Sequence, residues 1–127
     1  MEYNKYLIEA DELLTKVNNP NIRIFDATIM FNMGMSPEEA AKMPTAQEMY
    51  LQGHISGAAF FKHLDFSDTE SSYEYMLAPD KKLAHQIGKI GIDNDSEVIV
   101  YATNLLATAT RAWWLLRYAG VENVRVL

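Results

Sequence analysis

The stretch at residues 97–127 constrains the fold most, because it has the pattern of a complete strand, helix and strand. Residues 98–101 form a continuous apolar run rich in β-branched side chains, which is typical of a parallel strand buried on both faces. Helix-forming and aromatic residues follow at 111–118, and Gly120 stands where a left-handed residue ends a helix. A second β-rich run, 124–127, completes a βαβ unit with a right-handed crossover.

The connection at 102–110 is where this unit would carry a site, because ligands bind at the carboxyl ends of parallel strands. Backbone N–H groups at a helix N-terminus could stabilise a thiolate or a bound anion there. The connection contains neither cysteine nor glycine, and glycine most easily supplies the positive-φ positions of a tight anion-binding loop. We therefore interpret 102–110 as an ordinary β-to-α loop rather than a catalytic one.

Composition excludes several classes of function. The formal net charge of −6 and the pI of about 4.9 argue against nucleic acid or an anionic membrane as the main partner. The chain has no cysteine, which excludes disulfides, thiolate metal sites and a cysteine nucleophile. It shows no secretory signal and no apolar run near the roughly 20 residues that span a bilayer, so we expect a soluble, cytoplasmic protein.

The rest of the chain alternates between helical and strand patterns. We predict a sequence of elements: a short edge strand at Leu7-Ile8, a helix carrying Leu13, Leu14 and Val17, a strand at 22–25, a short helix or lid begun by Ser36, a helix at 45–52 ending at Gly53, an apolar strand within 54–61, a polar surface connection at 64–78, and a helix from Pro79 to Gly91. This order predicts an α/β fold with a central parallel sheet and helices on both faces. With 127 residues, one domain spanning 1–127 is expected. Since Leu127 ends a predicted buried strand, we also expect a fragment of a longer protein.

Two polar residues invite a catalytic interpretation. Asp26 stands at the carboxyl end of a predicted strand, where it could act as a general base, but an acceptor for loop N–H groups is the favoured role. His54 lies beside a glycine turn with no second histidine nearby, which favours a hydrogen-bonded structural role over a metal ligand or base. The methionines scattered over 30–43 could contact a soft or thiol ligand, although adaptable apolar packing is the commoner use.

The sequence resembles a rhodanese-like domain, most closely the N-terminal domain of the two-domain thiosulfate or 3-mercaptopyruvate sulfurtransferases. The resemblance spans nearly the whole chain. It is carried by Ile24-Phe25-Asp26-Ala27, by Tyr50-Leu51 with Gly53-His54-Ile55-Ser56-Gly57-Ala58, by Tyr73-Glu74-Tyr75-Met76-Leu77, by Ile90-Gly91-Ile92 before the strand at 98–101, and by Arg111-Ala112-Trp113-Trp114. It implies a three-layer α/β/α fold with a central parallel sheet.

The resemblance also implies a division of labour. In the family, a cysteine directly after the central strand takes sulfane sulfur as a persulfide and passes it to a thiophilic acceptor. Here Ala102 occupies that nucleophile position. In tandem enzymes the active cysteine lies in the C-terminal domain, and the N-terminal domain is catalytically silent. We therefore expect a chain that is not itself catalytic, with a second rhodanese domain as its partner and a small sulfur-containing substrate handled through that domain.

The implied cleft lies between the two domains. Its candidate residues here come from the loops at 26–29 and 102–110 and from the start of the next helix: Asp26, Ile29, Ala102, Asn104, Ala107 and Arg111. Arg111 could point toward an anionic substrate, although an ion pair with an acidic neighbour is the favoured alternative. His54 and Gly57 belong to the family's turn motif, and neither a metal nor a cofactor is implied.

Several features depart from the family pattern. Ser56 replaces a proline, Ala102 is neutral where an aspartate is common, residues 33–43 look like an insertion, and the connection after residue 101 looks longer than a compact cysteine loop. An alternative of another class stays open, namely an inactive stand-alone module that binds or regulates a protein. A phosphatase of the related cysteine-loop type is excluded, because that chemistry needs a thiolate. Of Trp113 and Trp114, we expect one to be buried and one to support a loop or interface.

Overall fold

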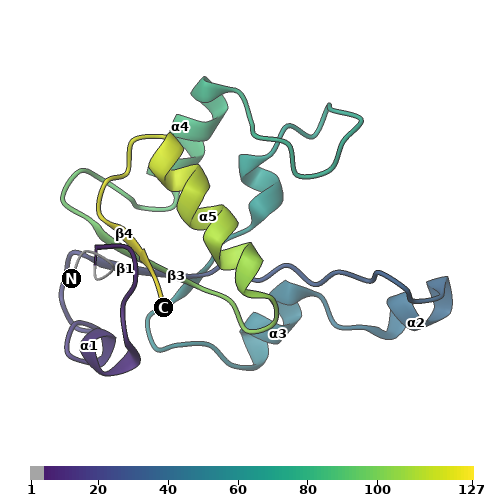
Figure 1. Cartoon of the computed structure of the whole chain (residues 1–127), viewed down its shortest axis with the longest axis horizontal. Coiled ribbons are helices and arrows are strands. Elements are labelled where there is room, and N and C mark those ends of the chain that lie inside the picture. The colour runs from purple at the N-terminus through teal and green to yellow at the C-terminus, as the bar shows by residue number, and fades with distance from the viewer. Residues whose placement is uncertain (1–4) are drawn as a thin grey trace.

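The structure is a computed structural model that describes residues 5–127, and its helices and strands alternate as the sequence predicts. Figure 1 shows their arrangement. The elements in chain order are α1 (Ala10–Leu14), β1 (Ile22–Asp26), α2 (Pro37–Lys42), α3 (Ala46–Gln52), β2 (Ala59–Phe60), the 3₁₀ helix η2 (His63–Phe66), α4 (Asp80–Lys89), β3 (Glu97–Tyr101), α5 (Leu106–Tyr118) and β4 (Val124–Val126).

The sheet has four strands, all parallel, in the order β2-β1-β3-β4. Ile24 pairs with Ile99 at its centre, and Val100 pairs with Val126. The edge strand expected at Leu7-Ile8 is reduced to one parallel bridge from Leu7 to Val126. Because every strand runs the same way, the carboxyl ends of β1, β2 and β3 meet at one edge of the sheet.

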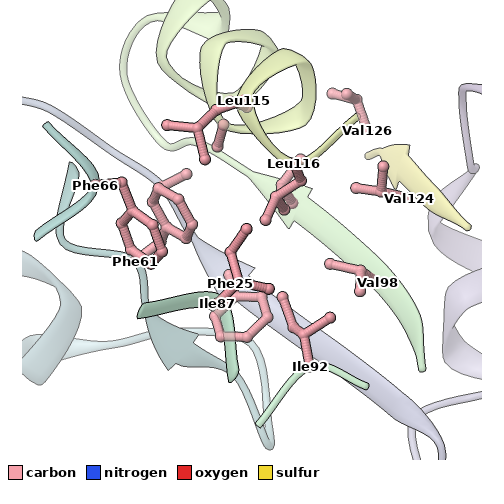
Figure 2. Close-up of a cluster of buried hydrophobic side chains, with 14 of the residues drawn as sticks. Phe25, Phe61, Phe66, Ile87, Ile92, Val98, Leu115, Leu116, Val124 and Val126 are labelled. Atoms are coloured by element: carbon pink, nitrogen blue, oxygen red, sulfur yellow. The ribbon is translucent and has the colours of Figure 1, made fainter. Parts of the chain in front are cut away.

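One face of the sheet carries the larger core. Side chains from β1, β3 and β4 pack there against α4, η2 and α5, and Figure 2 shows Leu115 and Leu116 of α5 lying over Val98 and Phe25. Phe61 stacks on Phe66 with ring centroids 4.2 Å apart. These strand residues are β-branched or aromatic, the types that fit a sheet covered by helices.

The opposite face carries a smaller core. Ile24, Ile99 and Tyr101 point to that side, where Leu13 of α1 and Ala58 pack with them. Successive residues of a strand point to opposite faces, so β3 supplies both cores by alternation. The predicted parallel sheet with helical cover on both faces is confirmed.

Two expectations about the loops need correction. The helix expected at 111–118 begins at Leu106, which leaves only residues 102–105 as the connection after β3. Thr108 and Ala109 are buried against the sheet, and this packing outweighs the weak helix preference of threonine. The connection is therefore short, and the inference of a lengthened loop was wrong.

The segment at 64–78 is more than a surface connection. Phe66, Ser67 and Ala78 are buried, and an isolated antiparallel bridge joins Ser67 to Leu77. The sequence pattern does not reveal that these residues are buried, because single apolar residues in a polar run carry no periodicity.

The segment at 28–53 carries two short helices, α2 and α3. Ser36 and Thr45 form capping boxes with Glu39 and Glu48, as Ser36-Pro37-Glu38-Glu39 predicts for the first of them. Neither α2 nor α3 has a fully buried residue, and Figure 1 shows α2 projecting from the body of the domain.

The two tryptophans behave as expected in part. Trp113 is partly buried and its indole N–H donates to the carbonyl of Val124 at 2.9 Å, whereas Trp114 is 53% exposed and stacks on Tyr118. Within residues 5–127, no helix combines the length and apolar character needed to cross a membrane.

Candidate functional site

The carboxyl ends of β1 and β3 are joined by a small hydrogen-bond network. Asp26, only 2% exposed, accepts bonds at one carboxylate oxygen from the Thr28 amide at 3.1 Å and the Thr28 hydroxyl at 2.6 Å. The Thr28 hydroxyl in turn accepts from the Thr103 amide at 3.1 Å. Asp26 therefore organises the loop, the role favoured from its position after a strand.

Tyr101 ends β3 beside this network. Its hydroxyl oxygen accepts the amide of Ile55 at 3.1 Å, which ties the turn before β2 to the sheet. Burial, together with the nearby Asp26 carboxylate, raises the pKa of Tyr101 above its ordinary value. The phenol therefore stays neutral at pH 7 and serves as a fixed hydrogen-bonding group.

The short connection after β3 continues the same edge. Ala102 is partly buried and packs on the larger core, while Asn104 is exposed and its amide approaches the sulfur of Met30 at 3.6 Å. Ala107 is exposed in the first turn of α5. Three of the candidate residues, Asp26, Ala102 and Asn104, thus come together at the joined ends of β1 and β3.

Arg111 lies in the second turn of α5 and bonds a different set of groups. Its guanidinium donates to Nδ1 of His63 at 2.7 Å, to the carbonyl of Tyr75 at 2.7 Å and to the hydroxyl of Ser67 at 3.4 Å. No carboxylate pairs with it among residues 5–127, so the favoured ion pair is absent. Neutral acceptors take the place of a carboxylate.

His63 is the buried partner of this arginine and is 3% exposed. Its Nε2 lies 2.8 Å from the carbonyl of Ala27, and its Nδ1 accepts from Arg111. Burial and the Arg111 charge lower the pKa of His63 to about 4, although the bond to Ala27 opposes them. His63 is therefore neutral at pH 7, with its proton on Nε2.

A hollow of about 560 Å³ opens beside the end of β1, and we call it the carboxyl-edge cleft. Its lining includes Ile29, Phe31, Met43, Lys62 and Tyr75. This size and mixed apolar and polar character suit a small-molecule or side-chain site. Another hollow, of about 570 Å³, lies beside Asp93 and Asn123 at the amino ends of the strands, away from these groups.

Comparison with known proteins decides the family. The model of the rhodanese-like domain matches residues 9–127. The chain belongs to the rhodanese-like domain family. It is 38% identical over 122 residues to a 3-mercaptopyruvate sulfurtransferase of Escherichia coli (strain K12), and 35% identical over 108 residues to a thiosulfate sulfurtransferase of Gallus gallus. These alignments cover 96% and 84% of this chain but only 41% and 34% of the two relatives.

A solved structure supports the same conclusion for the fold. A crystal structure described as the rhodanese fold of a 3-mercaptopyruvate sulfotransferase from Escherichia coli superposes with a TM-score of 0.80 at 35% identity. The superposition covers 97% of this chain and 44% of that one. The rhodanese-like α/β fold predicted from sequence is confirmed, and the chain spans less than half the length of these relatives.

This rhodanese-like domain lacks the cysteine chemistry that the resemblance describes. Its sequence contains no cysteine, and Ala102 follows the central strand β3 directly. A methyl group can neither attack a sulfur donor nor carry a persulfide. The domain is therefore not itself catalytic by a cysteine mechanism.

His54 and Gly57 lie in the turn that leads into β2, where the motif pattern places them. The His54 ring stacks on Tyr50 with centroids 3.9 Å apart, and its Nδ1 lies 2.7 Å from the Tyr50 carbonyl. Gly57 has φ of +82° and stands just before Ala58, whose amide closes the turn onto the Ile55 carbonyl at 2.9 Å. Both residues shape the turn in this structure.

Replacing Gly57 by alanine lowers the free energy of unfolding by about 1 kcal/mol, because an L side chain is strained at this φ while the site itself has open space. Urea unfolding measures the change. Gly53→Ala is the matched control, since Gly53 has an extended φ of 179° and equal space around it. Equal losses in the two variants would show that φ at Gly57 does not limit stability.

Sequence reasoning missed part of the site. Thr28, Thr103, His63 and Tyr75 carry its hydrogen bonds, yet none of them was named individually as a site residue. His63 had one usable signal, because it follows β2 as Asp26 ends β1, and polar residues at strand ends often organise loops. Tyr75 was named only as part of the family motif at 73–77, which gave no indication of its contacts.

Proposed function

We propose that this rhodanese-like domain is the N-terminal, non-catalytic half of a tandem sulfurtransferase that moves sulfane sulfur from thiosulfate or 3-mercaptopyruvate to a thiophilic acceptor. The active cysteine lies in a second rhodanese domain of the same chain. The present domain contributes its carboxyl edge to the wall of the cleft between the two domains, with Asn104 and Ala107 exposed there and the buried Asp26 and Ile29 supporting the loop after β1.

The alanine after β3 carries this proposal. Ala102 occupies the position of the nucleophile, while the surrounding fold is kept to a TM-score of 0.80 with an enzyme structure. The named relatives act on 3-mercaptopyruvate or thiosulfate by their descriptions, and each is more than twice as long as the part that this chain matches. An intact fold without its nucleophile is what a supporting half requires.

The structure adds a reason why the carboxyl edge suits this role. Asp26, Thr28 and Thr103 fix the ends of β1 and β3 to each other, so the loops at this edge form a rigid surface. Exposed apolar side chains flank it, with Leu105 and Leu106 at the start of α5 and Phe31 at the rim of the carboxyl-edge cleft. Such a surface favours contact with another domain.

The test compares the full-length gene product with the 127-residue chain in cyanide-dependent assays with each donor. We expect activity only in the longer product, and its loss when the cysteine after the central strand of the second domain is replaced by serine. Activity in neither protein, with an unrelated domain or none beyond residue 127, would refute the proposal. That outcome would support the alternative of an inactive module that binds or regulates a protein.

A further inference from the structure

Tyr75 has an unusual backbone conformation. Among residues 5–127 it is the one residue other than glycine with a positive φ, at 56°. A bulky side chain in the left-handed region is strained, and such residues persist only where their surroundings hold them. Strained residues gather at clamps and binding sites.

Arg111 makes the contacts that hold Tyr75. Its guanidinium donates to the Tyr75 carbonyl at 2.7 Å and lies 5.6 Å from the centre of the Tyr75 ring. The guanidinium is fixed in turn by His63, whose other ring nitrogen bonds the carbonyl of Ala27 just after β1. A continuous chain of contacts therefore runs from the end of β1 through His63 and Arg111 to Tyr75.

The ring of Tyr75 forms part of the carboxyl-edge cleft. It meets the ring of Phe31 edge to face, with centroids 6.2 Å apart, and both residues line the cleft. The two rings come from segments that lie far apart in the sequence, and neither segment is part of a strand. The position of the Tyr75 ring, and with it the shape of this aromatic wall, depends on the left-handed backbone that Arg111 holds.

We propose that Arg111 is a positioning residue, which locks Tyr75 in its left-handed conformation and so sets the aromatic wall of the carboxyl-edge cleft for the sulfur donor. The role toward the donor rests on the proposed function. Arg111 itself touches no donor, because its guanidinium is engaged by His63, Ser67 and the Tyr75 carbonyl behind the wall.

The first test uses the 127-residue chain and does not depend on activity. Hydrogen exchange is measured for the amides of residues 67–78 in wild type, Arg111→Met and Arg117→Met. Arg117 is the matched control, since it lies on the same helix, donates to the carbonyl of Glu122 and lies over two aromatic rings away from the cleft.

We expect exchange at 67–78 to rise by about tenfold or more in Arg111→Met, with α4 and β3 unchanged, and to stay at the wild-type rate in Arg117→Met. Equal exchange in the two variants would overturn the holding role. If Arg111→Met does not fold, Arg111→Lys takes its place, because one ammonium cannot span His63 and Tyr75 together and should loosen the same segment.

The second test uses the full-length product and separates binding from chemistry. Tyr75→Gly accepts the left-handed backbone and keeps the carbonyl that Arg111 binds, so it removes only the ring. We expect Tyr75→Gly and Arg111→Met each to raise the KM for the donor by about tenfold with little change in kcat, and Arg117→Met to leave KM unchanged.

An unchanged KM in Tyr75→Gly would overturn the role toward the donor, even if the exchange experiment shows that Arg111 holds the segment. A wild-type product inactive with both donors would overturn the proposed function and the donor role together. In that case the exchange rates still decide whether Arg111 positions Tyr75.

Discussion

Replacing Phe61 by alanine lowers the free energy of unfolding by about 3–5 kcal/mol, the range for an aromatic residue removed from a packed core. Phe61 is 0% exposed. Its ring stacks on Phe66 at 4.2 Å and meets Phe25 edge to face at 6.2 Å, so the cavity left behind cannot collapse without moving both the sheet and η2. Urea unfolding followed by tryptophan fluorescence measures the loss.

Phe31→Ala is the matched control for this prediction. The Phe31 ring is 37% exposed at the rim of the carboxyl-edge cleft, and its loss should cost less than about 1 kcal/mol. A comparable destabilisation in both variants would mean that the Phe61 cluster is not the centre of the core.

Acidification from pH 6.5 to pH 4 should lower the free energy of unfolding by up to about 3 kcal/mol through His63 alone. The pKa of His63 falls from 6.5 to about 4 on folding, mainly because the ring is buried and further because Arg111 is close. The unfolded chain therefore binds more protons than the native one between these two values. Stability is full above pH 6.5 and declines as the pH falls toward 4.

His63→Gln provides the control, because an amide can accept from Arg111 and donate to Ala27 but does not titrate. The variant should lose the pH dependence between 6.5 and 5. Glu97 contributes separately: burial raises its pKa, but its bonds to Lys16 and Arg125 outweigh burial and lower the pKa below the ordinary value of 4.5, so its contribution is lost as the pH falls below that value in both proteins. An equal slope in His63→Gln and wild type would contradict the assignment.

The order of the elements could be predicted because it rests on local patterns. The apolar run of β3, the Ser36 capping box and Gly120 after α5 each depend on a few neighbouring residues, and each is where sequence placed it. The start of α5 could not be predicted, because its first turns are stabilised by burial of Thr108 and Ala109 on the sheet rather than by local preference.

The sequence predicts that the site lies at the carboxyl edge of the sheet, but it does not predict which side chains contact each other there. Asp26 ends β1 and organises the loop that follows it, and both facts are readable from neighbouring residues. Arg111 binds His63 and Tyr75, which lie 48 and 36 residues away, and only the folded chain brings them together. An ion pair was a fair expectation for a half-buried arginine, but neutral acceptors happen to surround it.

We propose that the sulfur carrier lies outside these 127 residues. The most direct measurement is peptide mass spectrometry of the full-length product after incubation with thiosulfate or 3-mercaptopyruvate. We expect a gain of one sulfur atom on a single cysteine beyond residue 127, reversed by cyanide, and no gain on any peptide of residues 1–127. A full-length product without such a cysteine, or one that never gains sulfur, would contradict it.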